Sequence, residues 1–84
     1  MGKIEKLIRR LKSQPFDFTF EEAEAVLKHF GYVKSNKGRT SGSRVAFISN
    51  MYRTIILHRP HPSNILKPYQ VKQLVEALEE EGLI

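Results

Sequence analysis

The sequence predicts an α+β fold in which a three-stranded antiparallel sheet carries helices on one face. Three observations favour this class. Apolar residues recur with helical spacing near both ends of the chain, short β-prone runs occupy its middle, and 84 residues suffice for a single modest core. The expected element order is α-α-β-β-β-α. We therefore expect one domain over residues 1–84, with residues 1–15 as an N-terminal helical extension and residues 16–84 as the core.

The first predicted helix lies in the stretch GKIEKLIRRLKS. Its apolar residues Ile4, Leu7, Ile8 and Leu11 stand at positions i, i+3, i+4 and i+7 and so share one face. Pro15 is expected to end this helix, because proline does not fit inside a helix.

The second helix is predicted to begin at about Phe20, because Thr19 and Glu22 have the spacing of a capping box. Gly31 suits the left-handed residue that commonly follows a helix. Phe16, Phe18 and Phe20 alternate ahead of this helix, and we expect them to close the bottom of the core. The other residues expected to be buried on it are Ala23, Val26, Leu27 and Phe30.

Three strands are expected at about residues 32–34, 44–49 and 54–58, where branched and aromatic residues are frequent. A third helix then begins at Pro68, since proline suits the first helical position, and Gly82 ends it. Its predicted apolar stripe consists of Val71, Leu74, Val75 and Leu78. Residues 79–81 are all glutamates in its last turn, where the helix dipole prefers cations. They either keep this end solvated or contact a basic partner.

Charge is distributed unevenly along the chain, whose net charge is +5. All acidic residues lie at or before Glu24 or at or after Glu76, so the segment from Ala25 to Val75 contains none and holds nine cationic residues. Such a basic centre between acidic flanks favours a polyanionic partner, and nucleic acid is the first candidate. The alternative is a basic face that is merely solvated.

Other classes of protein are disfavoured by composition. The chain has no cysteine, which excludes disulfides, thiolate catalysis and cysteine-based zinc sites. No apolar run approaches the roughly 20 residues that span a bilayer, and the first ten residues lack the apolar stretch of a signal peptide. We therefore expect a cytoplasmic protein with no membrane partner and no cofactor.

Two of the three histidines are candidates for proton transfer. His58 ends the third predicted strand, and His61 follows in a proline-rich loop flanked by Arg59 and Lys67. An imidazole near cations is suited to acid–base chemistry during attack of a ribose 2′-hydroxyl on its neighbouring phosphate. Metal binding is not expected, because no Cys, Asp or Glu stands near these histidines. His29 lies beside core residues of the second helix, where a structural role is expected.

The stretch NKGRTSGSRVAF, residues 36–47, joins the first two predicted strands. Gly38 and Gly42 allow backbone amides to approach a phosphate, while Lys37, Arg39 and Arg44 supply positive charge. It is not a Walker loop, because the Gly-Lys-Ser/Thr ending is absent and a strand follows instead of a helix. The alternative is a hairpin connection without a functional role.

The Gly-Ser-Arg-Val-Ala-Phe entry into a strand, followed by HRPHPSNILKPYQVKQLVEALEEEGLI, resembles the HicA family of bacterial toxins. The resemblance covers residues 20–84. It implies a fold like that of double-stranded-RNA-binding domains, cleavage of mRNA as an mRNA interferase that arrests translation, and neutralisation by a HicB-like antitoxin.

One position departs from this resemblance. In the family a catalytic histidine usually follows Gly-Ser, at the next position or the one after, whereas this chain has Arg44 and Val45 there. Arginine stabilises charge but is a poor proton acceptor near neutral pH. Either His61 or His58 has replaced the base, or the chain binds RNA or its antitoxin without efficient cleavage. The residues expected to contact RNA are Lys37, Arg39, Ser43, Arg44, Arg59 and Lys67.

Overall fold

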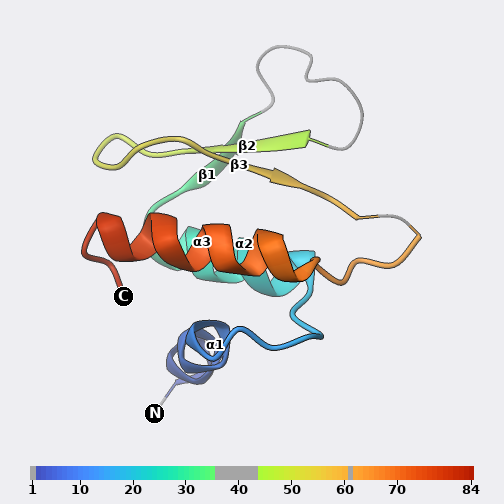
Figure 1. The fold of residues 1–84 in the computed structure, drawn as a ribbon. Coiled ribbons are helices and arrows are strands. Elements are labelled where there is room, and N and C mark those ends of the chain that lie inside the picture. Colours follow the sequence, from blue (N-terminus) through green and yellow to red (C-terminus); the bar gives the residue numbers. More distant parts are fainter. Residues whose placement is uncertain (1, 36–43, 61) are drawn as a thin grey trace.

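The computed structural model describes residues 2–35, 44–60 and 62–84, and it has the predicted α-α-β-β-β-α order (Figure 1). Helices α1 (Lys3–Lys12) and α2 (Phe20–His29) come first. Strands β1 (Val33–Ser35), β2 (Arg44–Ile48) and β3 (Ile55–His58) follow, and α3 (Pro68–Glu80) comes last. The predicted α+β class is thus confirmed, with strand bounds shifted by at most one residue.

The elements form three layers. The sheet has the order β1-β2-β3 with both pairs antiparallel. Helices α2 and α3 lie on one face of the sheet, and α1 lies beneath these helices, on the side away from the strands (Figure 1). The prediction that the helices share one face is therefore confirmed. No helix among the described residues is both long and apolar enough to cross a membrane.

The core lies between the sheet and the helix layer. Strand residues Phe47, Ile55 and Leu57 meet the apolar faces of α2 and α3, and the rings of Phe20 and Phe47 have centroids 6.1 Å apart. Leu11 extends the core to α1 and is fully buried. The predicted stripes of α2 and α3 are confirmed: Phe20, Ala23, Val26 and Leu27 are buried on α2, Phe30 is half-buried beside it, and Val71, Leu74, Val75 and Leu78 are buried on α3.

The predicted helix ends are present. The Glu22 amide donates to Thr19 Oγ1 at 3.1 Å, and Glu22 Oε1 accepts from the Thr19 amide at 2.9 Å, which completes the capping box. Gly31 has φ 92° and Gly82 has φ 73°, conformations that side-chain-bearing residues rarely adopt. Pro68 is the first residue of α3.

The predicted end of α1 before Pro15 is confirmed, but another expectation for the segment between α1 and α2 was wrong. Helix α1 ends at Lys12, with Pro15 two residues beyond the C-cap Ser13, whose hydroxyl donates to the Arg10 carbonyl at 2.6 Å. Phe16 is 88% exposed and closes no core. Alternating residues share a face only in extended backbone, and Phe16 lies in a turn, so only Phe18 and Phe20 point inward.

The glutamates at the end of α3 have an intramolecular role that the sequence did not suggest. Arg53 lies between β2 and β3, and its Nη2 is 3.0 Å from Glu80 Oε1. Its backbone amide also donates to Glu81 Oε1 at 3.2 Å. The turn between the strands therefore supplies the positive charge and the donor that the end of α3 lacks.

Candidate nucleic-acid interface

Arg44 and His58 form the centre of the candidate site. They are Cα partners in the β2–β3 ladder, and both are exposed. The neighbouring partners Val45 and Leu57 face the helices, so Arg44 and His58 lie together on the open face of the sheet. Side chains of directly opposed residues start about 4.5–5.5 Å apart at Cβ, which allows both to contact one ligand group.

The end of β3 is attached to the start of α3 by Gln70. Its Nε2 donates to the His58 carbonyl at 3.0 Å, and its Oε1 accepts from the Lys67 amide at 2.9 Å. Gln70 is only 4% exposed, and both ends of its amide are bonded. The position of His58, the last residue of β3, is therefore fixed by a buried hydrogen bond to α3 as well as by the pairing of the strands.

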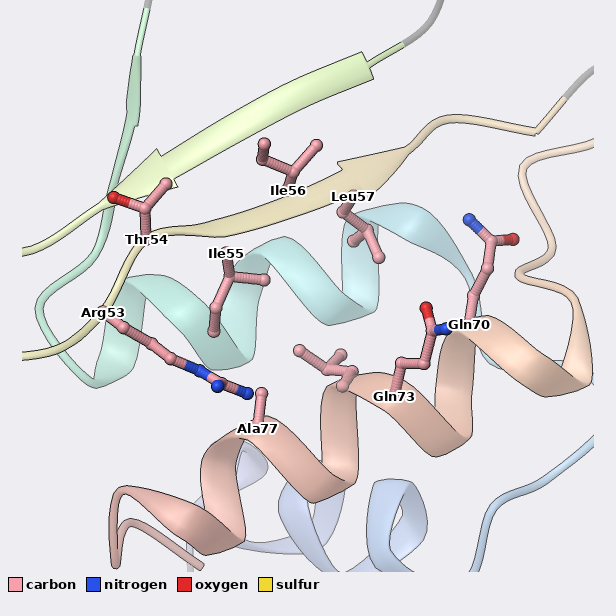
Figure 2. Close-up of a pocket in the computed structure, with 9 residues that line it drawn as sticks. Arg53, Thr54, Ile55, Ile56, Leu57, Gln70, Gln73 and Ala77 are labelled. Carbon is pink, nitrogen blue, oxygen red and sulfur yellow. The ribbon is translucent and has the colours of Figure 1, made fainter.

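A groove of about 240 Å³ runs along the outer edge of β3, beside α3 (Figure 2). Ile55 and Leu57 point from the strand toward the helices, whereas Ile56 points the other way (Figure 2). The residues that line the groove include no histidine, and its cationic residue, Arg53, pairs with Glu80. The groove thus lies apart from the Arg44–His58 pair and lacks groups for proton transfer.

Arg59 is predicted to contact phosphate, but the structure turns it toward the helix layer. Its guanidinium lies 4.7 Å from the ring centroid of Phe20, and its Nη2 is 3.8 Å from Glu21 Oε2. The ring face attracts a cation, and the carboxylate partly neutralises it. Arg59 is therefore not on the same face as Arg44 and His58.

Lys67 is exposed directly before α3. Two backbone hydrogen bonds attach its loop to the segment before α2: Leu66 N–H donates to the Phe18 carbonyl at 2.8 Å, and Phe20 N–H donates to the Asn64 carbonyl at 2.7 Å. Helices α2 and α3 therefore begin side by side, next to the end of β3. We call this end of the molecule, which carries Arg44 and His58 on the open face of the sheet and also Arg59 and Lys67, the basic end.

The other predicted site residues, Lys37, Arg39, Ser43 and His61, lie outside the described residues. His29 is exposed at the far end of α2, with its ring edge against Phe30, and takes no part in the basic end. Within residues 2–35, 44–60 and 62–84, no group of three or more His, Asp or Glu side chains is arranged to hold a metal ion.

Sequence reasoning missed Gln70 and the Phe20–Glu21 contact of Arg59. A signal for Gln70 was present, because it stands four residues before Leu74 and next to Val71, on the apolar stripe of α3. A polar residue at such a position usually has a specific hydrogen-bond partner. The Arg59 contact joins residues distant in sequence, and no local pattern indicates it.

The chain was also compared with known proteins. No curated protein and no solved structure matches it. A family model, described as the HicA toxin of bacterial toxin-antitoxin systems, matches residues 20–82, which is well over half of the chain and includes the whole sheet, α2 and α3. The chain therefore belongs to the HicA toxin family.

Proposed function

We propose that this toxin acts on RNA, and that it contacts RNA at the basic end and cleaves it without a metal ion. The observation that supports this most is the Arg44–His58 pair, which combines a fixed positive charge with an imidazole, a side chain suited to proton transfer. The pair lies on the exposed face of the sheet, where a long polymer has access.

The reaction we propose is internal transesterification. A base removes the proton of a ribose 2′-hydroxyl, the oxygen attacks the adjacent phosphorus, and the 5′-oxygen leaves with a proton from an acid. The products are a 2′,3′-cyclic phosphate and a 5′-hydroxyl. His58 and His61 are the candidate base and acid, and the sequence favours His61 as the base. Arg44 stabilises the charge that develops on the phosphoryl oxygens.

Binding is proposed to involve the segment before β2 as well as the basic end. Arg44 contacts the phosphates together with Lys37, Arg39 and Ser43, while Lys67 extends the positive surface. Arg59 contributes less, because phosphate must compete with Glu21 and with the Phe20 ring for its guanidinium. Each phosphate contact that forms releases counterions, so the affinity is expected to fall steeply as salt rises.

The proposed partners are mRNA, or another single-stranded or structured RNA, and a HicB-like antitoxin. Membership of a toxin-antitoxin family supports an antitoxin partner in general. We place the protein in the cytoplasm, where mRNA is translated, with no membrane partner.

A second function is favoured by one specific residue. Arg44 occupies the place where a catalytic histidine is usual in the family, and arginine does not accept a proton near neutral pH. Loss of a positioned base commonly removes about 10²- to 10⁴-fold of rate. The alternative function is therefore RNA or antitoxin binding on the same fold, with little or no cleavage.

The deciding experiment compares cleavage of a structureless RNA by purified wild type, His58→Ala, His61→Ala and Arg44→His, with chelator present throughout. We expect slow cleavage by wild type, a further loss in both alanine variants, and faster cleavage by Arg44→His. His29→Ala is the matched control, because His29 is an exposed histidine at the opposite end of α2.

The outcomes separate the two functions. Strong wild-type cleavage that survives both alanine substitutions would show that neither His58 nor His61 is a catalytic residue. No cleavage by wild type, combined with salt-dependent RNA binding in filter assays, would establish the binding module instead. Arg44→Ala is a further variant for both assays. If it cleaves and binds RNA as well as wild type does, the basic end takes no part in the mechanism.

A further inference from the structure

We infer that the groove between β3 and α3 binds one nucleobase of the RNA substrate and so determines a base preference next to the phosphate that Arg44 and His58 contact. The inference rests on the proposed function, because the base belongs to the RNA on which the basic end is proposed to act. The residues that line the groove include no histidine and no carboxylate, so its proposed role is recognition of the substrate and not catalysis.

The walls of the groove are apolar and come from both layers of the fold. Ile55 and Leu57 point toward the helices from β3, and Leu74 and Ala77 line the opposite side on α3 (Figure 2). These four side chains are 2–7% exposed, whereas Phe47 on the same face of the sheet is fully buried. The core is therefore open along the outer edge of β3, where a flat apolar ring can enter between the strand and the helix.

The size of the groove fits a single ring system. Its volume of about 240 Å³ is below the roughly 300–1,000 Å³ of pockets that enclose drug-sized ligands. A nucleobase is flat, with two apolar faces and a polar edge. Its faces match the apolar walls, and its edge requires hydrogen-bond donors and acceptors at the rim of the groove.

The backbone of β3 supplies a donor and an acceptor at this rim. Strand β3 is the last strand of the sheet, and no described strand pairs with its outer edge. The His58 carbonyl accepts from Gln70 on α3, which indicates that this carbonyl points to the outer edge and not to β2. In an antiparallel pair, alternate residues direct both backbone groups to the same edge. Ile56, two residues before His58, therefore presents its N–H and C=O at the groove.

These backbone groups fit the edge of one base better than an added peptide strand. The His58 carbonyl is already bonded to Gln70, so Ile56 alone within β3 offers both a donor and an acceptor at the outer edge. An added strand needs a row of such groups, and Pro60, which has no N–H, interrupts the row soon after β3. The Watson–Crick edge of every base carries a donor next to an acceptor, so one residue suffices for a base.

One end of the groove lies beside the Arg44–His58 pair. Gln70 lines the groove and also bonds the His58 carbonyl. Ile56 and His58 are about 7 Å apart along the strand, a distance that one nucleotide spans. A phosphate held by Arg44 and His58 on the open face therefore allows the adjoining base to turn over the edge of β3 into the groove. The carboxylate of Glu80 does not oppose this phosphate, because it pairs with Arg53 at the opposite end of the groove.

The first test titrates the full chain with the four nucleoside 3′-monophosphates and follows its amide and methyl signals by NMR. We expect shifts of the Ile56 amide and of the Leu57 and Leu74 methyl groups, with the preferred base bound at least about fivefold more tightly than the weakest. Ribose 5-phosphate is the control without a base, and it should shift signals of Arg44 and His58 but not those of the groove. Absence of shifts at Ile56 with all four nucleotides would overturn the inference.

A pair of variants at one position tests the groove in the RNA complex. Gln73 is exposed on α3 and lines the groove, so Gln73→Trp fills the opening while Gln73→Ala leaves it open. Sequencing the RNAs that each protein retains from a random pool measures base preference whether or not the chain cleaves. We expect a preference of at least about fivefold at one nucleotide for wild type and Gln73→Ala, and below about twofold for Gln73→Trp, with an almost unchanged melting temperature in both variants.

The remaining outcomes separate the groove from the proposed function. An unchanged base preference in Gln73→Trp, or an equal loss in both variants, would overturn the groove as a base site. If Gln73→Trp weakens only the binding of a protein partner, the groove is a peptide site and the inference is wrong. If wild type binds no RNA although mononucleotides shift the Ile56 amide, the proposed function fails and the nucleobase site stands.

Discussion

Arg10 on α1 donates to both carboxylate oxygens of Glu22 on α2, at 3.0 Å each, and so joins two helices whose sequence patterns give no sign of contact. The same guanidinium binds Asp17 Oδ1 and lies 5.4 Å from the Phe18 ring centroid. Glu22 is also the carboxylate of the capping box of α2. A single arginine thus holds the N-terminal helix against the cap of the next helix.

Arg10→Ala is expected to lower the free energy of unfolding by about 1 kcal/mol, because Nη1 contacts both oxygens of Glu22, Nη2 contacts Asp17, and the Arg10–Glu22 pair is only about a third exposed. Thermal unfolding should show a decrease of about 4–8 °C in Tm. Arg10→Lys should lose much of the same stability, since a single ammonium replaces the two guanidinium nitrogens that contact Glu22 and Asp17. Lys6→Ala, on the exposed side of α1, is the control. A Tm within 1 °C of wild type for Arg10→Ala would refute the joining role.

The stability of the protein is expected to depend on pH through Glu24. Burial raises the pKa of this carboxyl, but the hydrogen bond from Lys28 and the charge of Lys34 lower it by more, so its pKa lies below the usual value of 4.5. Because the folded-state pKa is the lower one, the stabilisation is present above about pH 4.5 and is lost as pH falls through the folded-state pKa.

Glu24→Gln should therefore destabilise the protein by roughly 0.5–1 kcal/mol at pH 7 and by progressively less below pH 4.5. Urea denaturation at several pH values measures this difference. Glu76→Gln, which changes an exposed carboxylate on α3, serves as the control. A constant difference between Glu24→Gln and wild type from pH 7 to pH 3 would contradict the assignment.

Gln70→Leu should destabilise the protein by about 1–3 kcal/mol, because the His58 carbonyl and the Lys67 amide each lose a partner at a poorly solvated position. Hydrogen exchange should become faster at the amides of Leu66, Lys67, His58 and Arg59, next to the lost contacts. Gln73→Leu is the matched control on the same helix, since Gln73 is exposed. Equal stability of the two variants would mean that Gln70 does not hold the end of β3.

Gly31→Ala is expected to cost about 1 kcal/mol, although no atom lies within 4 Å of the added Cβ. The cost arises from the backbone, which has φ 92° at this position. Gly2→Ala, at the N-cap of α1, where φ is −79°, should change stability much less. The comparison by chemical denaturation isolates the effect of the left-handed conformation, and equal effects of the two substitutions would argue against it.

Much of the fold was predictable because its signals are local. The change from helical spacing to β-prone runs after Gly31 predicted all three strands to within one residue, and the Thr19–Glu22 spacing predicted the start of α2. Phe16 was misassigned, since alternation in sequence does not reveal that the backbone turns at that residue.

The candidate site was less predictable because it depends on contacts between distant residues. The strand register sets Arg44 opposite His58, and the sequence gives strand positions but not their pairing. Arg59 was expected beside them, yet it lies just after β3, and its guanidinium lies on the helix side, next to Phe20 and Glu21. The contribution of α1 was also hidden, since its Arg10–Glu22 contact joins two elements through charged residues that look solvated in sequence.

The parallel start of α2 and α3 gives the protein an electrical polarity along its helix layer. The backbone hydrogen bonds between residues 18–20 and 64–66 make both helix dipoles point their positive ends toward the basic end. The side chains of α3 reinforce this polarity, because its first turn has no acidic residue and Glu79, Glu80 and Glu81 stand at its other end. The side chains of α2 oppose it, with Glu21 and Glu22 in the first turn and Lys28 in the last. In the field of RNA, the proposed partner, the polarity of α3 exerts a torque that presents Arg44 and His58 first. The consequence is kinetic: productive encounters become more frequent without any additional contact in the complex, and this gain in association rate disappears as ionic strength rises.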